Sequence, residues 1–379
     1  MPWKEQTAMS QKLEFIACLA HWEGPFAQLC KSFGISRPTG YKWRKRHAEG
    51  GEEGLQEFSR RPCRSPALTS PRVVQEVLAV REEHPAWGGR KIHWRLKGRG
   101  HANPPAPSTI TDILRRAGRL GEREKTISVR RFEKAFPNQS WQVDFKGHYA
   151  TTLAGRCHPL TVTDDHSRFN LLLHACPGER RQYVQSGLTA AFRRYGMPVV
   201  LQFDNGPPWG SVQNGQRVLT KVACWLIRLG IEVRHIRPHH PQSNGKAERF
   251  HRTLQQEVIS RQTFSDLRHC QRVFDRWRAD YNLRRPHEAL AYAVPAARYR
   301  PSPRRFPERL PAVEYESGVA VRKVYGNGTV QFKGNSYRIG KALKEEYVAL
   351  RATTKDGEYA VYYCTQQIGK LTLRGAKHV

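Results

Sequence analysis

Between residues 137 and 298 the chain alternates short apolar runs with longer segments of helical spacing. The apolar runs read WQVDF, HPLTVTD, NLLLHAC, VVLQFD and IEVRHI. The helical segments read YVQSGLTAAFRRYG, VLTKVACWLIRLG, AERFHRTLQQEV and DLRHCQRVFDRWRADYN. This alternation is typical of a β-sheet covered by helices. We therefore predict an α/β domain over residues 138–298.

The first 58 residues carry three helical segments in the order of a helix-turn-helix domain. A helix is expected from Ser10, a shorter one follows Gly24-Pro25, and Ser36 is a suitable N-cap for the third. The start of such a third helix points at base edges, which predicts base contacts for Arg37 and Thr39. Other polar residues of this helix can meet phosphates: Lys42, Arg44 and Lys45. An ordinary three-helix bundle is the alternative.

Residues 66–120 repeat the helical pattern and indicate a second helix-turn-helix unit. Helices are expected from Ser70, within WGGRKIHWRLKGRG and from Ser108, which is a candidate N-cap. The middle helix carries Arg90 and Lys91, which are candidates for DNA contact. Two such units in tandem suit a protein that reads a longer DNA site than one unit covers.

Segments rich in Gly, Pro and Arg separate these parts. AEGGEEG (48–54) has the composition of a linker. RRPCRSP (60–66) is too rich in Pro for a helix, and it is either an arm for the minor groove or a bare linker. Residues 121–137 form a basic connector, and RPSPRRFPERLP (300–311) reads as a Pro/Arg-rich linker. The domains are therefore expected at 1–58, 66–120, 138–298 and 312–379.

Residues 312–379 alternate polar and apolar side chains with a period of two. The runs VAVRKV, TVQF, SYRI, EYVALRAT and EYAVYYC are separated by GNG, KGN and KDG turns. This pattern predicts a small antiparallel β-barrel. The fold expected for the chain is multi-domain, with all-α helix-turn-helix units, an α/β core and a C-terminal β-barrel.

The charge of the chain points to a polyanionic partner. Lys and Arg number 64 against 33 acidic residues, so the formal net charge is +31. Each phosphate that a cation neutralises releases condensed counterions, so double-stranded DNA explains this excess best. Enzymes of small metabolites seldom carry it, and no small-molecule cofactor is expected. A surface that is basic for solubility or assembly alone is the alternative.

Cysteine usage and hydropathy bear on the compartment. The eight cysteines are scattered without C-x-x-C spacing, which argues against a zinc finger and against a disulfide framework. The N-terminus lacks the continuous apolar run of a secretory signal, and no apolar run is long enough to span a membrane. We expect a cytoplasmic protein in the nucleoid, beside DNA and with no membrane partner.

Three acidic residues stand where the predicted sheet ends. Asp144 lies in the strand WQVDF and Asp204 ends VVLQFD, whereas Glu248 falls in the first turns of a helix that Ser243 or Asn244 can cap. Strand pairing brings distant positions together at one edge of such a sheet, so the three carboxylates can meet. Taken singly, each acid has another interpretation, as a turn cap or as part of a surface ion pair.

A group of three carboxylates in so basic a chain indicates a site for divalent metal. Phosphodiester cleavage requires an activated oxygen nucleophile, in-line geometry and a stabilised leaving oxygen, which two Mg²⁺ (or Mn²⁺) ions per site supply. Hard oxygen ligands suit these ions. We therefore predict that Asp144, Asp204 and Glu248 are the catalytic, metal-binding residues. Asp164 and Asp165 are rivals, but their turn sequence TVTDDHSR favours a structural role; the alternative is that one of them assists the site.

The residues around these acids resemble insertion-sequence transposases with a retroviral-integrase-like DDE core. The resemblance rests on WQVDF, FDNG, HHPQSNGKAERFHRTL and YNLRRPHEAL, and it covers 138–298. It implies an RNase H-like fold, with the metal-binding triad at Asp144, Asp204 and Glu248. It also implies Mg²⁺-dependent cutting at element ends to expose a 3′-OH, followed by attack of that hydroxyl on target DNA.

The chain departs from that family pattern in three ways. The segment from Asp204 to Glu248 is about two helical turns longer than the typical spacing, and GPPWGSVQNGQRV is expected to be an inserted loop. Gln255 stands where relatives often carry a Lys that contacts DNA, and Arg252 lies on nearly the same helical face and could substitute. The His/Cys zinc module that begins retroviral integrases does not occur in this sequence.

Other polar residues stand close to the acids in the sequence. Asn205 and Asn244 are candidates for fixing the orientation of the carboxylates, and Lys246, Arg249 and Arg252 for gripping the DNA strand. His240 has two interpretations, as a loop-packing residue or as a catalytic base. A group near the last helix of the core is expected to serve packing: Tyr281, Asn282, Arg285, Pro286 and His287.

The sequence thus predicts a DNA transposase whose helical units bind the terminal repeats of its element and whose core cleaves and transfers strands. Because two element ends must be brought together, a homo-oligomer on DNA is expected. One alternative is a domesticated DNA-binding regulator with a catalytically silent core. Another is a stand-alone nuclease of the same fold.

Overall fold

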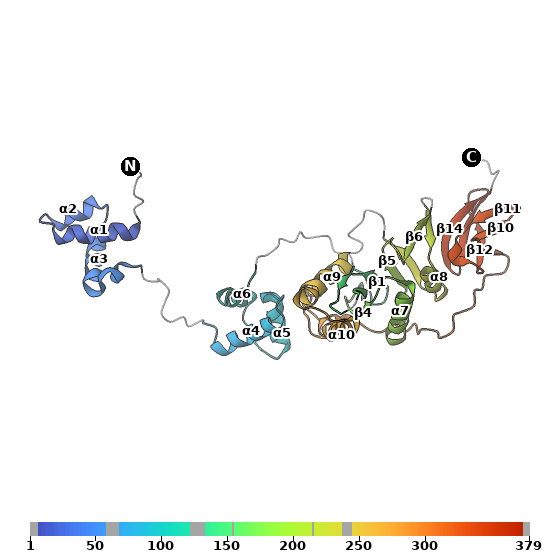
Figure 1. The fold of residues 1–379 in the computed structure, drawn as a ribbon, viewed down its shortest axis with the longest axis horizontal. Coiled ribbons are helices and arrows are strands. Elements are labelled where there is room, and N and C mark those ends of the chain that lie inside the picture. Colours follow the sequence, from blue (N-terminus) through green and yellow to red (C-terminus); the bar gives the residue numbers. More distant parts are fainter. Residues whose placement is uncertain are drawn as a thin grey trace. The chain divides into compact units, whose positions relative to one another are not determined.

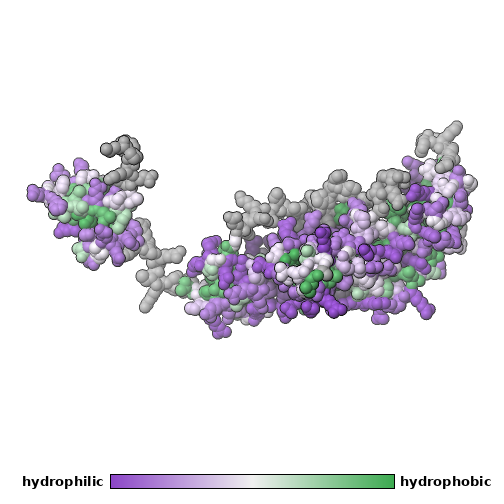
Figure 2. Space-filling model, in the orientation of Figure 1, coloured by the Kyte–Doolittle hydropathy of each residue, from purple (hydrophilic) through white to green (hydrophobic). Residues whose placement is uncertain are grey.

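The structure is a computed structural model that describes residues 7–57, 68–121, 133–153, 155–213, 216–236 and 245–373, without the side chains of residues 211–217. The chain divides into two compact units, Met1–Leu68 and Thr69–Val379 (Figure 1). None of the helices within the described ranges combines the length and apolarity that crossing a bilayer requires. On the face drawn in Figure 2, hydrophilic residues cover most of the surface, as the charge of the chain leads one to expect.

The first unit holds the predicted helix-turn-helix order. Its helices are α1 (Ala8–Ala20), α2 (Phe26–Ser32) and α3 (Arg37–Gly50). The hydroxyl of Ser36 accepts a hydrogen bond from the amide of Thr39, so the predicted N-cap of the third helix is confirmed. The side chains buried between the helices are Phe15, Leu29, Cys30 and Trp43.

The segment 48–54, predicted as a linker, is helical, and that prediction is wrong. α3 continues to Gly50, and a 3₁₀ helix, η1 (Gly51–Leu55), follows it directly. Leu55 is fully buried, and Gly54 lies so close to α3 that a Cβ would come within 2.1 Å of the carbonyl oxygen of Arg46. Gly is therefore required here by a close backbone approach, whereas composition alone suggested flexibility.

The second unit begins with three further helices, α4 (Pro71–Glu83), α5 (Gly89–Gly98) and α6 (Pro107–Arg116). Val77, Val80, Trp87, Ile92, Leu96, Ile110, Ile113 and Leu114 form their common core. The predicted N-cap Ser108 is wrong, because α6 starts at Pro107 after Ala106 and has no side-chain cap. Proline fixes the φ of the first helical residue and so defines the helix start by itself.

The α/β core contains a six-stranded mixed sheet in the order β2-β3-β1-β5-β8, with β4 paired to β3. β5 pairs in parallel with both β1 and β8, whereas β3 pairs antiparallel with β1, β2 and β4. The strands are β1 (Ser140–Phe145), β2 (Tyr149–Ala150), β3 (Arg156–Asp164), β4 (Asn170–Cys176), β5 (Val200–Phe203) and β8 (Glu232–His235).

Helices cover both faces of this sheet (Figure 1). α7 (Arg181–Tyr195) and α8 (Lys221–Arg228) share a hydrophobic cluster with one face, in which Trp141 and Val143 of β1 take part. α9 (Gly245–Glu257) and α10 (Leu267–Leu283) share a second cluster with Leu173 of β4. Because strand residues alternate between faces, Gln142 and Asp144 of β1 belong to the side of α9.

The predicted inserted loop is partly a β-hairpin. β6 (Gly210–Gln213) and β7 (Gln216–Leu219) pair antiparallel and have no recorded pairing with the main sheet among the described residues. The six-stranded sheet on either side is intact, so the extra residues are accommodated locally.

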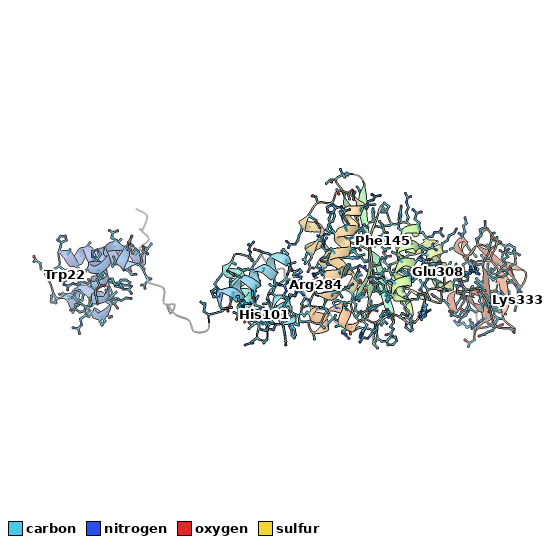
Figure 3. All side chains as sticks on the ribbon, turned by 90° about the horizontal axis from the view of Figure 1, so that it is seen from below. Trp22, His101, Phe145, Arg284, Glu308 and Lys333 are labelled. Carbon is cyan, nitrogen blue, oxygen red and sulfur yellow. The ribbon has the colours of Figure 1, made fainter. Side chains whose placement is uncertain are left out.

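The predicted linker 300–311 has neither helix nor strand, and it is held along the core by hydrogen bonds. After the short α11 (Pro295–Arg298), the amide of Met197 donates to the carbonyl of Arg304 at 2.7 Å. The guanidinium of Arg304 donates to the carbonyls of Gly230 (2.7 Å) and Pro198. Glu308, labelled in Figure 3, accepts two hydrogen bonds from Arg193 of α7. Composition suggested a free segment, but backbone carbonyls at helix and strand ends bind this Arg.

The C-terminal strands form a four-stranded antiparallel sheet, β14-β13-β12-β9, and a separate hairpin, β10-β11. Among the described residues, no recorded strand pairing joins the two into a closed barrel. The side-chain amide of Gln366 binds both the N–H and the C=O of Val233 at 2.9 Å and so occupies the edge of β8. The strands are β9 (Ala320–Lys323), β10 (Thr329–Phe332), β11 (Asn335–Arg338), β12 (Tyr347–Ala352), β13 (Glu358–Tyr363) and β14 (Gln366–Thr372).

Candidate active site

Two of the predicted carboxylates stand at the same end of two neighbouring parallel strands. β1 and β5 pair in a constant register, in which Ser140 faces Val200 and Gln142 faces Gln202. Continued by two residues, the same register would set Asp144 opposite Asp204. Carboxyl ends of parallel strands share one edge of the sheet, which is where α/β proteins build their sites.

An aromatic cluster supports these strand ends. Phe145 follows Asp144 and Phe203 precedes Asp204, and the indole of Trp209 packs against both rings. Trp209 is 2% exposed and Phe203 is buried as well. The two aspartates thus extend from a packed apolar platform, although each is a polar residue at a strand end.

Helix α9 lies over β1 in a fixed register. The amide of Ala247 donates to Oε1 of Gln142 at 3.2 Å, and Nδ1 of His251 lies 4.0 Å from Oδ2 of Asp144. Two strand residues span roughly 6.6 Å and four helical residues roughly 6 Å, so the two contacts match in spacing. Glu248 lies between them in the first turn of α9.

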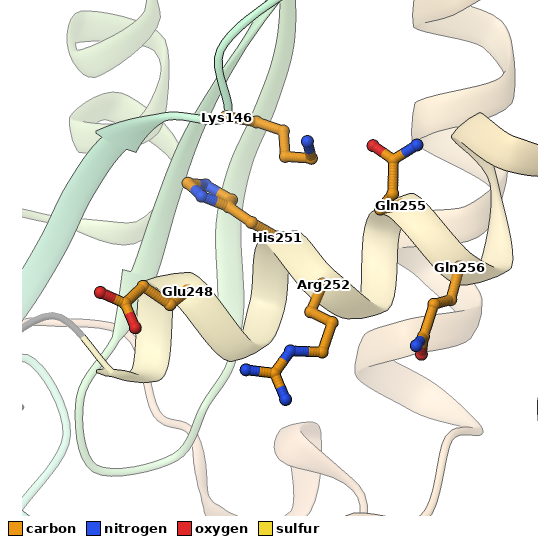
Figure 4. A pocket seen from close by; sticks show the side chains of 6 residues that line it. All are labelled: Lys146, Glu248, His251, Arg252, Gln255 and Gln256. Carbon is orange, nitrogen blue, oxygen red and sulfur yellow. The ribbon is translucent and has the colours of Figure 1, made fainter. Parts of the chain in front are cut away.

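Glu248 is exposed and lines a pocket of about 410 Å³ beside the strand ends. The other residues around this pocket are Lys146, His251, Arg252, Gln255 and Gln256 (Figure 4). Five of the six come from α9, and Lys146 extends towards them from the segment after β1 (Figure 4). The pocket therefore offers one acidic and two basic side chains to a ligand at the surface.

His251 is the site residue that the sequence did not reveal. The hydroxyl of Thr161 donates to the carbonyl of Asp144 at 3.0 Å, so its oxygen accepts from Nε2 of His251 at 2.8 Å. Burial, together with the charge of Lys146, lowers the pKa of His251 to about 3. The imidazole is therefore neutral near pH 7, and its approach to Asp144 is not an ion pair. The sequence contains one indication that His251 belongs to the site, since it stands three residues after Glu248, one helical turn along α9.

The charge of Asp204 is poorly compensated by the protein. Burial raises the pKa of its carboxyl group, while a hydrogen bond from the amide of Gly206 and the neighbouring His235 act in the opposite direction. A buried carboxylate whose pKa is raised in this way gains most from a nearby cation. The oxygen donors of Asp144, Asp204 and Glu248 are also the type that Mg²⁺ and Mn²⁺ prefer.

The three carboxylates do not converge into a coordination cluster here. Within the described ranges, no group of three or more His, Cys, Asp and Glu side chains is close enough to hold a metal ion. Ionised carboxylates repel one another, and a bound cation would favour their closer approach. The residues therefore fit a divalent metal by donor type and by position at one sheet edge.

Asp164 has the structural role that the sequence predicted. Its carboxylate is fully buried and accepts hydrogen bonds from the amides of Asn138 (2.7 Å) and Ser167 (2.8 Å) and from the hydroxyl of Ser167 (2.6 Å). These contacts close the turn between β3 and β4. Asp165 instead turns towards α9, where it forms an ion pair with Lys246.

The remaining candidates near the acids are placed as follows. The side-chain amide of Asn205 donates to the carbonyl of Ile236 at 2.9 Å and so joins the end of β5 to the end of β8. Arg249 and Arg252 are exposed on α9, whereas Lys246 is half-buried. His240, Ser243 and Asn244 lie outside the described residues.

The packing role predicted for the residues at the C-terminal end of α10 and just after it is confirmed. The side-chain amide of Asn282 exchanges hydrogen bonds with the backbone of Asn170, at 2.8 and 2.9 Å. Arg285 forms a buried ion pair with Glu257 at 3.0 Å, and the indole of Trp277 donates to the same carboxylate at 3.1 Å. These contacts hold the C-terminal end of α9 to the core.

Comparisons with protein families give the same order along the chain, with helical domains first, then the α/β core and then the C-terminal sheet. Homeodomain-like domains match residues 7–56 and 39–114, and integrase core domains match residues 135–241 and 229–295. The C-terminal domain of IS481 family transposases matches residues 319–378.

Two curated relatives each match more than three fifths of this chain. The "uncharacterized 31.7 kDa protein" of insertion element IS407 from Burkholderia multivorans is 30% identical over 257 residues, which is 62% of this chain and 88% of that protein. The "uncharacterized 39.2 kDa protein" of insertion element IS476 from Xanthomonas euvesicatoria is 31% identical over 254 residues, 63% of this chain and 67% of that protein. The chain belongs to the insertion-element transposases with an integrase core.

Solved integrase structures are more distant from this transposase. A simian T-cell lymphotropic virus intasome in complex with the PP2A regulatory subunit B56 gamma is 16% identical, with a TM-score of 0.36, over 76% of this chain and 96% of that one. The HTLV-2 integrase catalytic core in complex with magnesium is 15% identical, with a TM-score of 0.28, over 39% and 88%. At these scores the resemblance carries no argument about the chemistry of the transposase.

The DNA-contact candidates differ between the two helical parts of the transposase. In the first unit Arg37, Lys42, Arg44 and Lys45 are exposed, and Thr39 shares a hydrogen bond with Ser36. In the second unit Arg90 pairs with Glu288 at 3.2 Å. Burial, reinforced by Arg285, lowers the pKa of Lys91 to about 7. The basic face of α5 thus meets core residues, whereas that of α3 is open to solvent.

Proposed function

We propose that this transposase cuts DNA at the ends of its element to expose a 3′-OH and joins that hydroxyl to target DNA. Asp144, Asp204 and Glu248 are the residues assigned to this chemistry. The observation that supports the assignment is the parallel register of β1 and β5, whose continuation by two residues would set the two aspartates opposite each other, together with the contact of α9 on β1.

Asp144, Asp204 and Glu248 would hold Mg²⁺ or Mn²⁺, two ions per site. When bound, these ions activate the attacking oxygen and stabilise the leaving oxygen of the phosphodiester. The protein itself positions the metal-binding residues and excludes water from beneath them. The hydroxyl of Thr161, itself bonded to His251, holds the backbone of Asp144, and the aromatic platform around Trp209 keeps water from beneath the strand ends. Asn205 and Asn244 are assigned to orienting the neighbouring backbone and carboxylates.

The DNA strand is assigned to the exposed side of α9. Arg249 and Arg252 project from it, and Lys146 faces the same pocket as Glu248. Cations at these positions can meet phosphates on either side of the scissile bond. Lys246 is a further candidate for this contact, and it also forms an ion pair with Asp165.

The helical domains, at 1–58 and 66–120, are assigned to the terminal repeats of the element. Arg37 and Thr39 would contact bases, while Lys42, Arg44 and Lys45 would contact phosphates. Arg90 is 66% exposed and could meet a phosphate as it stands, whereas Lys91 would do so only if its contacts with the core open. The C-terminal region, 312–379, is proposed to close as a small barrel that contributes DNA or subunit contacts, and a homo-oligomer on DNA would bring the two ends together.

A strand-transfer assay tests this proposal. Full-length transposase, Mg²⁺, supercoiled target plasmid and labelled duplexes of the element ends should yield joined product. The product should vanish with EDTA and with Asp204→Asn, while Asp275→Asn, an exposed acid on α10, should leave it unchanged. Binding of the ends without nicking or joining would support the regulator instead. Digestion without joining would support the nuclease.

A further inference from the structure

The first turn of α9, which carries Glu248, is held by a polar network centred on Asp165. The helix begins at Gly245, and the amides of its first turn have no partners within the helix. One of them, that of Ala247, donates to Oε1 of Gln142 at 3.2 Å. Any change in the orientation of the Gln142 amide group would therefore release the start of the helix.

Asp165 fixes that orientation. Oδ1 of Asp165 accepts from Nε2 of Gln142 at 3.3 Å, so the opposite end of the amide must present its oxygen to α9. Oδ2 of Asp165 accepts from the amide of Lys134 at 2.9 Å. One buried carboxylate thus joins β1, the segment before it and the β3–β4 turn.

Lys246 completes the network from the helix side. Its ammonium group pairs with Oδ2 of Asp165 and donates to the carbonyl of the same residue at 3.4 Å. The Lys246 side chain is 19% exposed and that of Asp165 is 9% exposed. A pair so far removed from water is strongly unfavourable to break on one side, because the remaining charge stays desolvated. Lys246 stands two residues before Glu248, in the same helical turn.

The rest of α9 is held by other contacts. His251 bonds to Thr161 in the second turn, and Glu257 pairs with Arg285 at the C-terminal end. Loss of Asp165 would therefore leave the helix in place and free only its first turn. Of the three carboxylates, Glu248 is the one that depends on this turn.

We propose that Asp165 and Lys246 form a positioning pair that sets Glu248 at the metal site, with Gln142 as the link to β1. The inference rests on the proposed function for its catalytic consequence, but the geometry of the first turn can be measured without it. Residues that orient metal ligands typically change metal affinity by about ten- to a hundredfold when they are replaced.

The test compares full-length wild type with Asp165→Asn and Lys246→Met. Hydrogen exchange of the Ala247 amide, which Gln142 protects, should accelerate about tenfold or more, while exchange around Glu257 should stay unchanged. In Mn²⁺ titrations followed by electron paramagnetic resonance, half-saturation should require about tenfold more metal ion. The double variant should be no worse than either single variant, because both remove the same interaction.

Two further variants separate a loss of Glu248 positioning from a general loss of structure. Glu133→Gln removes an exposed carboxylate that pairs with Arg168 and Arg298 in the same region, and it should change neither readout. Lys246→Arg, which retains the charge, should restore most of the Mn²⁺ affinity. Unchanged exchange and unchanged Mn²⁺ half-saturation in both Asp165→Asn and Lys246→Met would overturn the proposal. If these readouts change but wild type never joins DNA, the positioning pair stands and the proposed function fails.

Discussion

The indole of Trp209 stacks on the ring of Phe203, with the ring centroids 4.8 Å apart and 20° between the planes. The same indole lies 5.6 Å from the ring of Phe145. These two phenylalanines adjoin Asp204 and Asp144, so one side chain from the inserted segment packs against both strand ends that carry carboxylates. The insertion is therefore part of the site's support.

Replacing Trp209 should damage both stability and activity. Trp209→Ala removes a 2% exposed indole and should lower the free energy of unfolding by about 3 to 5 kcal/mol. Strand transfer should fall more than stability alone explains, because the two aspartates lose their common platform. Trp209→Phe should retain most of both. Urea unfolding and strand-transfer rates measure these effects, with the exposed Leu283→Ala as a control expected to change stability by about 0.5 kcal/mol or less. Equal behaviour of Trp209→Ala and the control would contradict this role.

The ion pair between Arg285 and Glu257 should contribute far more to the free energy of unfolding than the pair that the adjacent Arg284 forms with Asp280. The Arg285 and Glu257 side chains are 9% and 11% exposed, and Arg285→Met would leave the Glu257 charge buried. We expect a loss of about 3 to 5 kcal/mol in the free energy of unfolding. Arg284 pairs with Asp280 at 3.8 Å and is 63% exposed, so Arg284→Met should cost about 1 kcal/mol or less. Similar losses in the two variants, measured by urea unfolding, would refute the distinction.

Stability should fall on acidification because His251 must stay neutral in the folded protein. Its ordinary pKa of 6.5 applies to the unfolded chain, whereas burial lowers the pKa to about 3 in the fold. The unfolded state therefore binds a proton first, and stability present above pH 6.5 is lost as the pH falls towards 3. Between pH 7 and pH 5 this amounts to about 2 kcal/mol from His251. Unfolding measured across this range should show a shallower decline for His251→Asn, and an unchanged decline for the exposed His148→Asn. An unaltered slope in His251→Asn would show that this residue does not carry the effect.

The local sequence was sufficient to predict the strand ends that carry Asp144 and Asp204. Each acid closes a short apolar run, and the alternation of strands and helices leaves few ways to pair those runs. The local sequence also predicts the Ser36 N-cap, because this cap depends on a hydrogen bond between residues three positions apart. What the sequence could not give is the way α9 lies on β1. The contacts of His251 with Thr161 and of Lys246 with Asp165 join residues far apart in the chain, and no local pattern encodes them.

Composition did not reveal the order of two segments, for a related reason. Residues 48–54 and 300–311 are rich in Gly, Pro and charged residues, which is typical of linkers. Their order comes from single anchoring contacts, the burial of Leu55 in one case and the bonds of Arg304 to Gly230 and Pro198 in the other. An anchor of one residue leaves the average composition of a segment unchanged, so only the tertiary structure reveals it.

Salt dependence should separate the roles of two exposed residues on α3. Arg44→Gln removes a proposed phosphate contact, so binding should weaken for every duplex and the slope of log K against log salt should fall by about 1. Arg37→Gln removes a proposed base contact at the helix start, so binding to the element ends should weaken by about 1 to 3 kcal/mol while binding to unrelated duplex changes little. Fluorescence anisotropy over a salt series measures both quantities, with the exposed Lys31→Gln on α2 as a matched charge loss. A slope for Arg44→Gln equal to that of wild type, or an Arg37→Gln variant that keeps its preference for element ends, would show that α3 does not read the DNA in this orientation.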